Sequence, residues 1–210
     1  MSMFEINDLS NIQVEVFDGS KIFIADNFYK HPEQILDCFL LRKVPTLWKG
    51  NEQPSYNNIH FLDLKHSFND DEFSKVGLKL SEICGQPAPA SSTVKTNFVK
   101  LLNKQFNDYE NNYWGPHRDH GYTALIYFNT VPAITNIYEQ LEEDCWTTPE
   151  HFEPWRSKTK YKIIKQLEGS FNRLVMFDGK KFLHGMDFSN DDFFKMFRMN
   201  QVLFFKEPLI

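Results

Sequence analysis

The stretch GPHRDHGYTALIYFN, residues 115–129, joins a short polar motif to an apolar run that favours a β-strand. In the motif, His117 and Asp119 form an H-x-D pair just before the run. Side chains two residues apart on a strand share one face, so the imidazole and the carboxylate can point to one position while Arg118 points away. His120 would not share that face and is left out of the site. The pair predicts a metal ion at this common position, if a third residue that can bind the metal exists elsewhere in the chain.

A third candidate ligand, His184, lies far downstream, after an apolar run and a turn. Two histidines and one carboxylate form the facial set that suits non-haem Fe(II) and leaves the opposite positions of the metal open. Each residue alone has an ordinary structural explanation, because H-x-D tripeptides and single histidines are common. Together and in this order, His117, Asp119 and His184 predict a metal site.

A cationic residue, Arg198, stands at the start of a further strand-like run, residues 197–205. An arginine that projects into a barrel beside a metal needs a partner, because buried arginine is rare unless it is paired. A dicarboxylate that chelates the metal by one end and pairs bidentately with Arg198 by the other would supply that partner. The sequence therefore points to an anionic cosubstrate.

In order and spacing, these residues resemble the Fe(II)/2-oxoglutarate-dependent oxygenase superfamily. The run Leu-Ile-Tyr-Phe-Asn, residues 125–129, is similar to the Y-L-N strand of the prolyl-hydroxylase-like branch. The Pro-His-x-Asp motif is shared with some uncharacterised phage-type members. The resemblance covers about residues 95–205. It implies a mainly β fold in which N-terminal helices pack on a double-stranded β-helix core of the jelly-roll or cupin type.

The resemblance also implies a role for each candidate residue. The two histidines and the aspartate would hold Fe(II), and 2-oxoglutarate and O2 would take the remaining positions of the metal. Arg198 and Tyr127 would orient the distal carboxylate of 2-oxoglutarate, and Asn200 would be the polar partner on the same face as the arginine. The implied reaction is hydroxylation of a substrate C–H bond with release of succinate and CO2. The carboxylate of Asp119 favours hydroxylation or demethylation, because related halogenases carry a small residue there.

Not every part of the pattern follows the family. Many members carry Gly-Gly-Glu after the Y-L-N strand, whereas this chain has Ala-Ile-Thr-Asn at residues 133–136. Tyr127 and Asn200 are also compatible with a purely structural position in a strand. The geometry on the substrate side of the site therefore cannot be transferred from the family.

The N-terminal part of the chain, residues 1–93, is expected to pack on the barrel. Residues 11–29 read as two short strands around an Asp-Gly turn. Apolar residues at helical spacing predict helices over residues 31–42 and 70–84.

The C-terminal part, residues 94–210, is expected to form the catalytic core within one integrated domain. Short apolar runs predict strands over residues 96–102, 123–128, 173–177 and 201–205. Such strands after a helical region favour an antiparallel double-sheet barrel of jelly-roll type. Between them, the charged residues 139–168 show no clear period and are interpreted as a long insertion or lid.

The composition disfavours several classes of partner. The net charge is −5 without a block of like charges, which disfavours a nucleic-acid partner. No apolar run reaches membrane-spanning length and no signal peptide is visible, so no membrane partner is expected. Three widely spaced cysteines, Cys38, Cys84 and Cys145, favour the reducing cytoplasm. The substrate is expected to be a small molecule, a peptide or a protein. The sequence specifies neither the identity of the substrate nor the oligomeric state.

Two other functions are compatible with the same motifs. One is a cupin-like metal protein that uses the three ligands without 2-oxoglutarate, such as a zinc-activated hydrolase or isomerase. The other is a non-catalytic jelly-roll binding protein with a vestigial site. Arg198 counts against the first, because it is hard to explain without an anionic cosubstrate, and the complete set of residues counts against the second.

Overall fold

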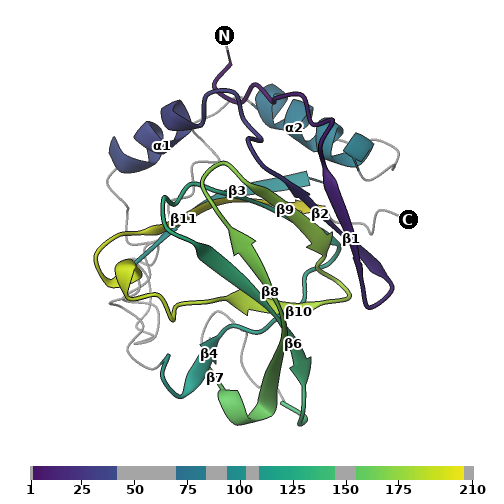
Figure 1. Ribbon diagram of the computed structural model, residues 1–210, viewed down its shortest axis with the longest axis vertical. Helices are drawn as coiled ribbons and strands as arrows, with labels where there is room; N and C mark the ends of the chain where they lie inside the picture. Colours follow the sequence, from purple (N-terminus) through teal and green to yellow (C-terminus); the bar gives the residue numbers. More distant parts are fainter. Residues whose placement is uncertain (1, 42–69, 84–93, 103–108, 145–154, 206–210) are drawn as a thin grey trace.

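The computed structural model describes residues 2–41, 70–83, 94–102, 109–144 and 155–205, which form two helices and antiparallel β-sheets (Figure 1). The protein is mainly β, as the sequence predicts. The elements, in chain order, are β1 (Gln13–Phe17), β2 (Ser20–Ala25), α1 (Pro32–Leu41), α2 (Asp70–Ile83), β3 (Val94–Leu101), β4 (Asn112–Trp114), β5 (Tyr122–Tyr127), β6 (Ala133–Gln140), β7 (Trp155–Ser157), η3 (Lys158–Lys160), β8 (Tyr161–Gly169), β9 (Leu174–Asp178), β10 (Leu183–Met186), η4 (Asp191–Phe194) and β11 (Arg198–Phe205).

The strands form one large sheet, one small sheet and a two-stranded ribbon. The large sheet has the order β1-β2-β9-β5-β11-β3, the small sheet has the order β10-β6-β8, and β4 pairs with β7. Beyond these strands, an isolated antiparallel bridge joins His117 to His184, so the chain before β5 runs alongside β10. Figure 1 shows the helices on one side of the large sheet and the small sheet on the other.

Two apolar clusters hold these layers together, because the strands of the large sheet are covered on both faces. One cluster joins α1 and α2, through Ile35, Val76 and Leu80, to one face of the sheet. The other joins the opposite face to the small sheet, whose buried residues include Ile137 and Leu167. Alternation along a strand therefore decides which cluster a side chain enters. A side chain between the two sheets lies in the interior where the candidate site is found.

The N-terminal elements confirm the sequence predictions closely. The β1–β2 hairpin turns at Asp18 and Gly19, which both have positive φ (46° and 71°), as a tight hairpin turn requires. Helix α1 begins at Pro32, a residue whose fixed φ and missing N–H suit the first helical position. Its buried side includes Ile35, and the buried side of α2 includes Val76 and Leu80.

The stretch predicted as an insertion, residues 139–168, differs from the expectation. β6 extends to Gln140, and β7, η3 and most of β8 occupy the second half of the stretch. β8 pairs with β6 along its length and is therefore part of the small sheet. β8 is an edge strand of this sheet, and its charged residues give a pattern that resembles a loop when the sequence is read alone. Residues 145–154 lie outside the described residues.

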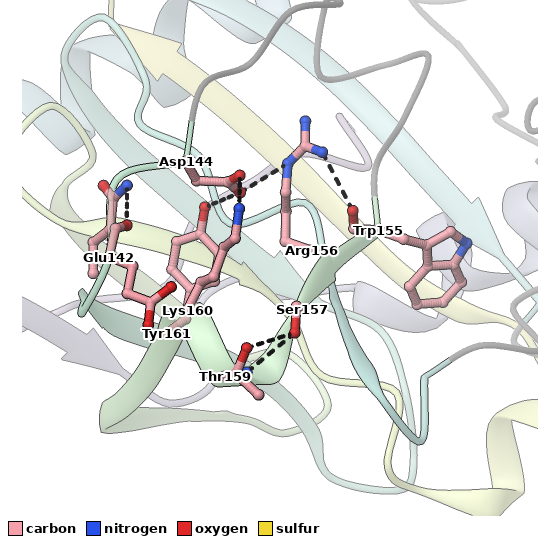
Figure 2. Close-up of polar contacts among 9 residues, drawn as sticks. Glu142, Asp144, Trp155, Arg156, Ser157, Thr159, Lys160 and Tyr161 are labelled. Atoms are coloured by element: carbon pink, nitrogen blue, oxygen red, sulfur yellow. Dashed lines mark hydrogen bonds and ion pairs between the residues drawn. The ribbon is translucent and has the colours of Figure 1, made fainter.

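The chain on either side of residues 145–154 is fixed by ion pairs around Asp144 (Figure 2). The Asp144 carboxylate accepts hydrogen bonds from Lys160 Nζ at 2.8 Å and from the Tyr161 hydroxyl at 2.7 Å. Arg156 Nε lies 3.5 Å from Asp144 Oδ2. Burial alone would raise the pKa of Asp144, but these partners hold the pKa below its usual value. The carboxylate therefore ties the end of β6 to β7 and β8.

Two further observations concern membrane-spanning helices and cysteines. Among them, no helix is long and apolar enough to cross a membrane. Cys38 is a free thiol, and Cys84 and Cys145 lie outside the described residues.

Candidate metal centre

The structure brings together the three ligands that the sequence predicts. The ligand atoms of His117, Asp119 and His184 all lie within 4.8 Å of one another. Asp119 Oδ2 is 3.2 Å from His184 Nε2, and Asp119 Oδ1 is 3.7 Å from His117 Nε2. Residues that are far apart in the sequence therefore present one imidazole, one carboxylate and one imidazole to a single position.

Backbone hydrogen bonds hold the three ligands in place. His117 N–H donates to the His184 carbonyl at 2.9 Å, and His184 N–H donates to the His117 carbonyl at 2.8 Å. Asp119 N–H donates to the Gly179 carbonyl at 2.9 Å, in the turn between β9 and β10. The two histidines are thus a cross-strand pair, and their rings lie 4.5 Å apart between centroids.

The hydrogen bonds of the imidazoles show that the group of residues fits a cation. Nδ1 of His117 lies 2.5 Å from the Gly115 carbonyl oxygen, and Nδ1 of His184 lies 2.9 Å from the Phe182 carbonyl oxygen. A carbonyl oxygen only accepts, so Nδ1 carries the proton in both rings and Nε2 of a neutral ring presents its lone pair. These lone pairs face the Asp119 carboxylate. Such an arrangement of electron pairs is stabilised by a positive charge between them, which is the arrangement of a metal site with carbonyl-anchored histidines.

Asp119 is held as a carboxylate. Burial alone would raise its pKa, but the neighbouring His184 and His117 and a hydrogen bond from Thr123 together lower the pKa below its usual value. The Thr123 hydroxyl donates to Asp119 Oδ2. The site thus supplies an anionic ligand at neutral pH, as divalent metals require.

Arg198, the predicted anchor, is 1% exposed and projects from the start of β11. Its Nη1 donates to Asn200 Oδ1 at 2.9 Å, and its Nη2 donates to the Ile134 carbonyl and to Thr135 Oγ1, each at 3.2 Å. Among the described residues, no carboxylate forms an ion pair with it, and its Nε has no hydrogen-bond partner. Burial lowers the pKa of Arg198, although Tyr127 and the charge of Asp187 act against this shift.

Tyr127 and Asn200 lie beside this guanidinium, as predicted. They are directly opposite one another on β5 and β11. The guanidinium carbon of Arg198 lies 5.6 Å from the centre of the Tyr127 ring, and the Tyr127 hydroxyl is 2.8 Å from Thr135 Oγ1. Burial raises the pKa of Tyr127, so its hydroxyl stays protonated and able to donate. We call Tyr127, Thr135, Arg198 and Asn200 the guanidinium cluster.

The guanidinium cluster and the three metal ligands share the interior between the two sheets. Tyr127 belongs to the apolar cluster between the sheets, together with Ile137 and Phe177. Ile137 is the cross-strand neighbour of His184, and the Phe177 ring lies 4.8 Å from the His184 ring. A buried cation and the three candidate metal ligands therefore border the same apolar cluster between the sheets.

Three supporting residues were not predicted from the sequence. Thr123 contacts Asp119, Thr135 contacts both Tyr127 and Arg198, and Asn129 holds the backbone around the arginine. The Asn129 side chain donates to the Phe197 carbonyl at 2.6 Å and accepts from Met199 N–H at 2.7 Å. The contacts of Thr135 and Asn129 join distant segments, so no local pattern marks them, although Asn129 ends the quoted strand motif. Thr123 lies only four residues after Asp119, so their contact is local.

His120, which is left out of the predicted site, is exposed and takes no part in the ligand cluster. Trp114 and Trp155 contact each other edge to face, with ring centroids 5.4 Å apart, and Trp114 packs in the same way on Phe188. Trp114 on β4 and Trp155 on β7 are cross-strand partners, and Trp114 belongs to the apolar cluster between the sheets.

Tyr127 depends on a close approach at Gly169, the last residue of β8. A Cβ added to Gly169 would overlap with the Tyr127 ring. We expect Gly169→Ala to lower the free energy of unfolding by about 1–3 kcal/mol, the usual cost of an overpacked core. Urea denaturation measures this change. In a Tyr127→Leu background the added methyl group finds space, so the same substitution should cost much less; an equal cost in both backgrounds would contradict the assignment.

Comparisons with known proteins add no family to this description: no model of a known protein family matches the chain, and no curated protein matches it.

Proposed function

We propose that the protein is an Fe(II)- and 2-oxoglutarate-dependent dioxygenase that hydroxylates a C–H bond of its substrate. The observation that carries the proposal is Arg198, a buried guanidinium with no ion-pair partner among the described residues, in the same interior as two histidines and an aspartate. Burying a cation costs free energy unless it is paired. A bound dicarboxylate would pair with it and would reach the metal by its other end.

The proposal includes a double-stranded β-helix core. It is supported by two antiparallel sheets that share one apolar interior. The ligands and the guanidinium cluster come from both sheets, with His184 on β10 of the small sheet and Arg198 on β11 of the large sheet. In a barrel of this type, inward-facing side chains from the two sheets converge on one cavity.

In this proposal the residues of the chain have separate tasks. His117, Asp119 and His184 would hold Fe(II), which supplies the activation of O2 and the oxidation of the substrate when it is bound. Arg198 would form the charge-assisted pair with the distal carboxylate of 2-oxoglutarate, and the Tyr127 hydroxyl would donate to the same group. The surrounding apolar residues, including Ile137 and Phe177, would exclude water from the reacting groups.

The main alternative is a zinc-dependent hydrolase or isomerase with the same three ligands. Two histidines and one carboxylate also make an open catalytic zinc site. Arg198 distinguishes the two functions, because a zinc hydrolase needs no anionic cosubstrate that would pair with a buried guanidinium. A non-catalytic binding protein would need neither the ligand set nor the buried cation.

The test of this proposal needs no substrate. Without oxygen, we expect the protein with Fe(II) and 2-oxoglutarate to show the weak visible metal-to-ligand charge-transfer band of the chelate. Succinate, which has the distal carboxylate but lacks the keto acid, is the matched control and should give no band. If iron or zinc binds but 2-oxoglutarate gives no band and does not bind, the zinc-hydrolase proposal replaces ours. If no metal binds, a structural or binding role remains.

A further inference from the structure

Asp119 is held by two residues, Thr123 at its carboxylate and Gly179 at its backbone N–H. The Thr123 hydroxyl donates a hydrogen bond to Asp119 Oδ2, and the Gly179 carbonyl accepts the Asp119 N–H at 2.9 Å. Thr123 lies on β5 and is 1% exposed, and its cross-strand neighbour is Phe177 on β9. Gly179 immediately follows β9. Both residues therefore lie on or directly next to strands of the large sheet.

The fit between these three residues depends on the missing side chain of Gly179. A Cβ at this position would overlap with Thr123 Oγ1, would lie 2.8 Å from the Gly121 carbonyl oxygen and would lie 3.0 Å from Asp119 Cβ. The near neighbours are backbone or short, buried side chains, which cannot move aside easily. Only glycine leaves the hydroxyl of Thr123 and the carboxylate of Asp119 in contact.

The hydroxyl of Thr123 is not required for the packing of β5. The inward-facing residues that follow it on the strand, Leu125 and Tyr127, are part of the apolar cluster between the sheets. Valine has nearly the same shape as threonine and suits a buried strand better. A buried hydroxyl is costly unless it is hydrogen-bonded, and the bond to Asp119 satisfies this one.

We propose that Thr123 is a positioning residue of the metal site, which orients the carboxylate of Asp119 toward His117 and His184 through the hydrogen bond to Oδ2. The inference rests on the proposed function only in that the three residues bind a metal. It adds that the orientation of the Asp119 carboxylate depends on the hydroxyl of Thr123. Gly179 provides the space that this arrangement needs.

The role matters because a carboxylate can bind a metal in more than one orientation unless a neighbouring group holds it. An outer partner of this kind also orients the ligand before the metal arrives, and the loss of such a partner typically weakens metal binding about 10–100-fold. Thr123 would therefore affect both the affinity and the geometry of the site.

The experiment measures metal binding alone, with Co(II) as the probe and without 2-oxoglutarate. We expect Thr123→Val to weaken Co(II) binding about 10–100-fold and to change the visible ligand-field spectrum of the bound ion. Thr123→Ser keeps the hydroxyl and should restore the wild-type spectrum and an affinity within about threefold of wild type. Gly179→Ala keeps the hydroxyl but removes its space, and should reproduce the effect of Thr123→Val.

The outcomes separate this inference from the proposed function. If Thr123→Val binds Co(II) as tightly as wild type with an unchanged spectrum, Thr123 has only a structural role and the inference is wrong. If the variants behave as expected but 2-oxoglutarate gives no charge-transfer band with Fe(II), the inference holds and the dioxygenase function fails. A wild-type protein that binds no metal overturns both. Thermal unfolding of the metal-free variants identifies any loss of affinity that comes from unfolding.

Discussion

The His184→Ala and Asp119→Ala variants are each expected to lose metal binding and all turnover. Each substitution removes one of the three candidate ligands found among the described residues, and the ligand atoms lie within 4.8 Å of one another. Loss of an outer partner already costs about 10–100-fold in metal affinity, so loss of a ligand should cost more than about 100-fold. Equilibrium dialysis against Fe(II) without oxygen, followed by measurement of bound iron, tests this expectation.

His120→Ala is the matched control for these variants. His120 lies one residue after Asp119 but is exposed and outside the ligand cluster. It should bind iron as wild type does. Circular dichroism of each variant checks that the fold is retained, since His184 is buried. If His184→Ala or Asp119→Ala folds and binds iron with wild-type affinity, that residue does not belong to the site.

Replacement of Arg198 by methionine is expected to separate cosubstrate binding from metal binding. Methionine fills a similar apolar volume but has neither the charge nor the donors of the guanidinium. The hydrogen bonds that hold Arg198 go to Asn200, Ile134 and Thr135. None of them goes to a candidate metal ligand. Iron should therefore bind normally. Removal of one partner of a buried charge pair typically costs about 2–5 kcal/mol, so 2-oxoglutarate should bind roughly 30-fold to a few thousand-fold more weakly.

Titration of the charge-transfer band with 2-oxoglutarate measures this change. Arg198→Lys keeps the charge but loses the fork of donors, so its affinity should lie between those of wild type and Arg198→Met. Arg118→Ala is the control, because Arg118 lies between two metal ligands in the sequence yet is exposed and contacts the Lys181 carbonyl. If Arg198→Met binds 2-oxoglutarate as wild type does, the guanidinium is not its anchor and the proposed function loses its main support.

The sequence alone predicted which residues come together at the candidate site better than it predicted the residues that hold them. The pair at positions 117 and 119 was predicted from strand periodicity, although β5 begins only at Tyr122 and His117 forms an isolated bridge. Arg198 stood out because a cation beside a metal in a barrel needs an anionic partner. Local spacing also predicted α1, α2 and the β1–β2 hairpin, since each depends on contacts between near neighbours. The structure places His184 beside His117, a proximity that the sequence could only infer from chemistry.

The contacts that the sequence did not predict are those between strands. Thr135 reaches Tyr127 and Arg198 only because β6 lies opposite β5 and β11, and no local pattern in β6 records that pairing. β8 was interpreted as part of an insertion because residues 139–168 are charged and show no clear period. Its place in the small sheet is set by pairing with β6. The pairing of strands that are far apart in the chain could therefore not be predicted from this sequence alone.

The backbone bridge between His117 and His184 bears on how the protein could acquire its metal. In many small metal-binding domains the ion gathers its ligands and the chain folds only when it is bound. Here two backbone hydrogen bonds and a third to Asp119 already hold the ligands together. We therefore expect the loaded and metal-free protein to share one fold. The metal content could then rise and fall with the supply of the ion in the surroundings, without exposing the chain to aggregation or degradation.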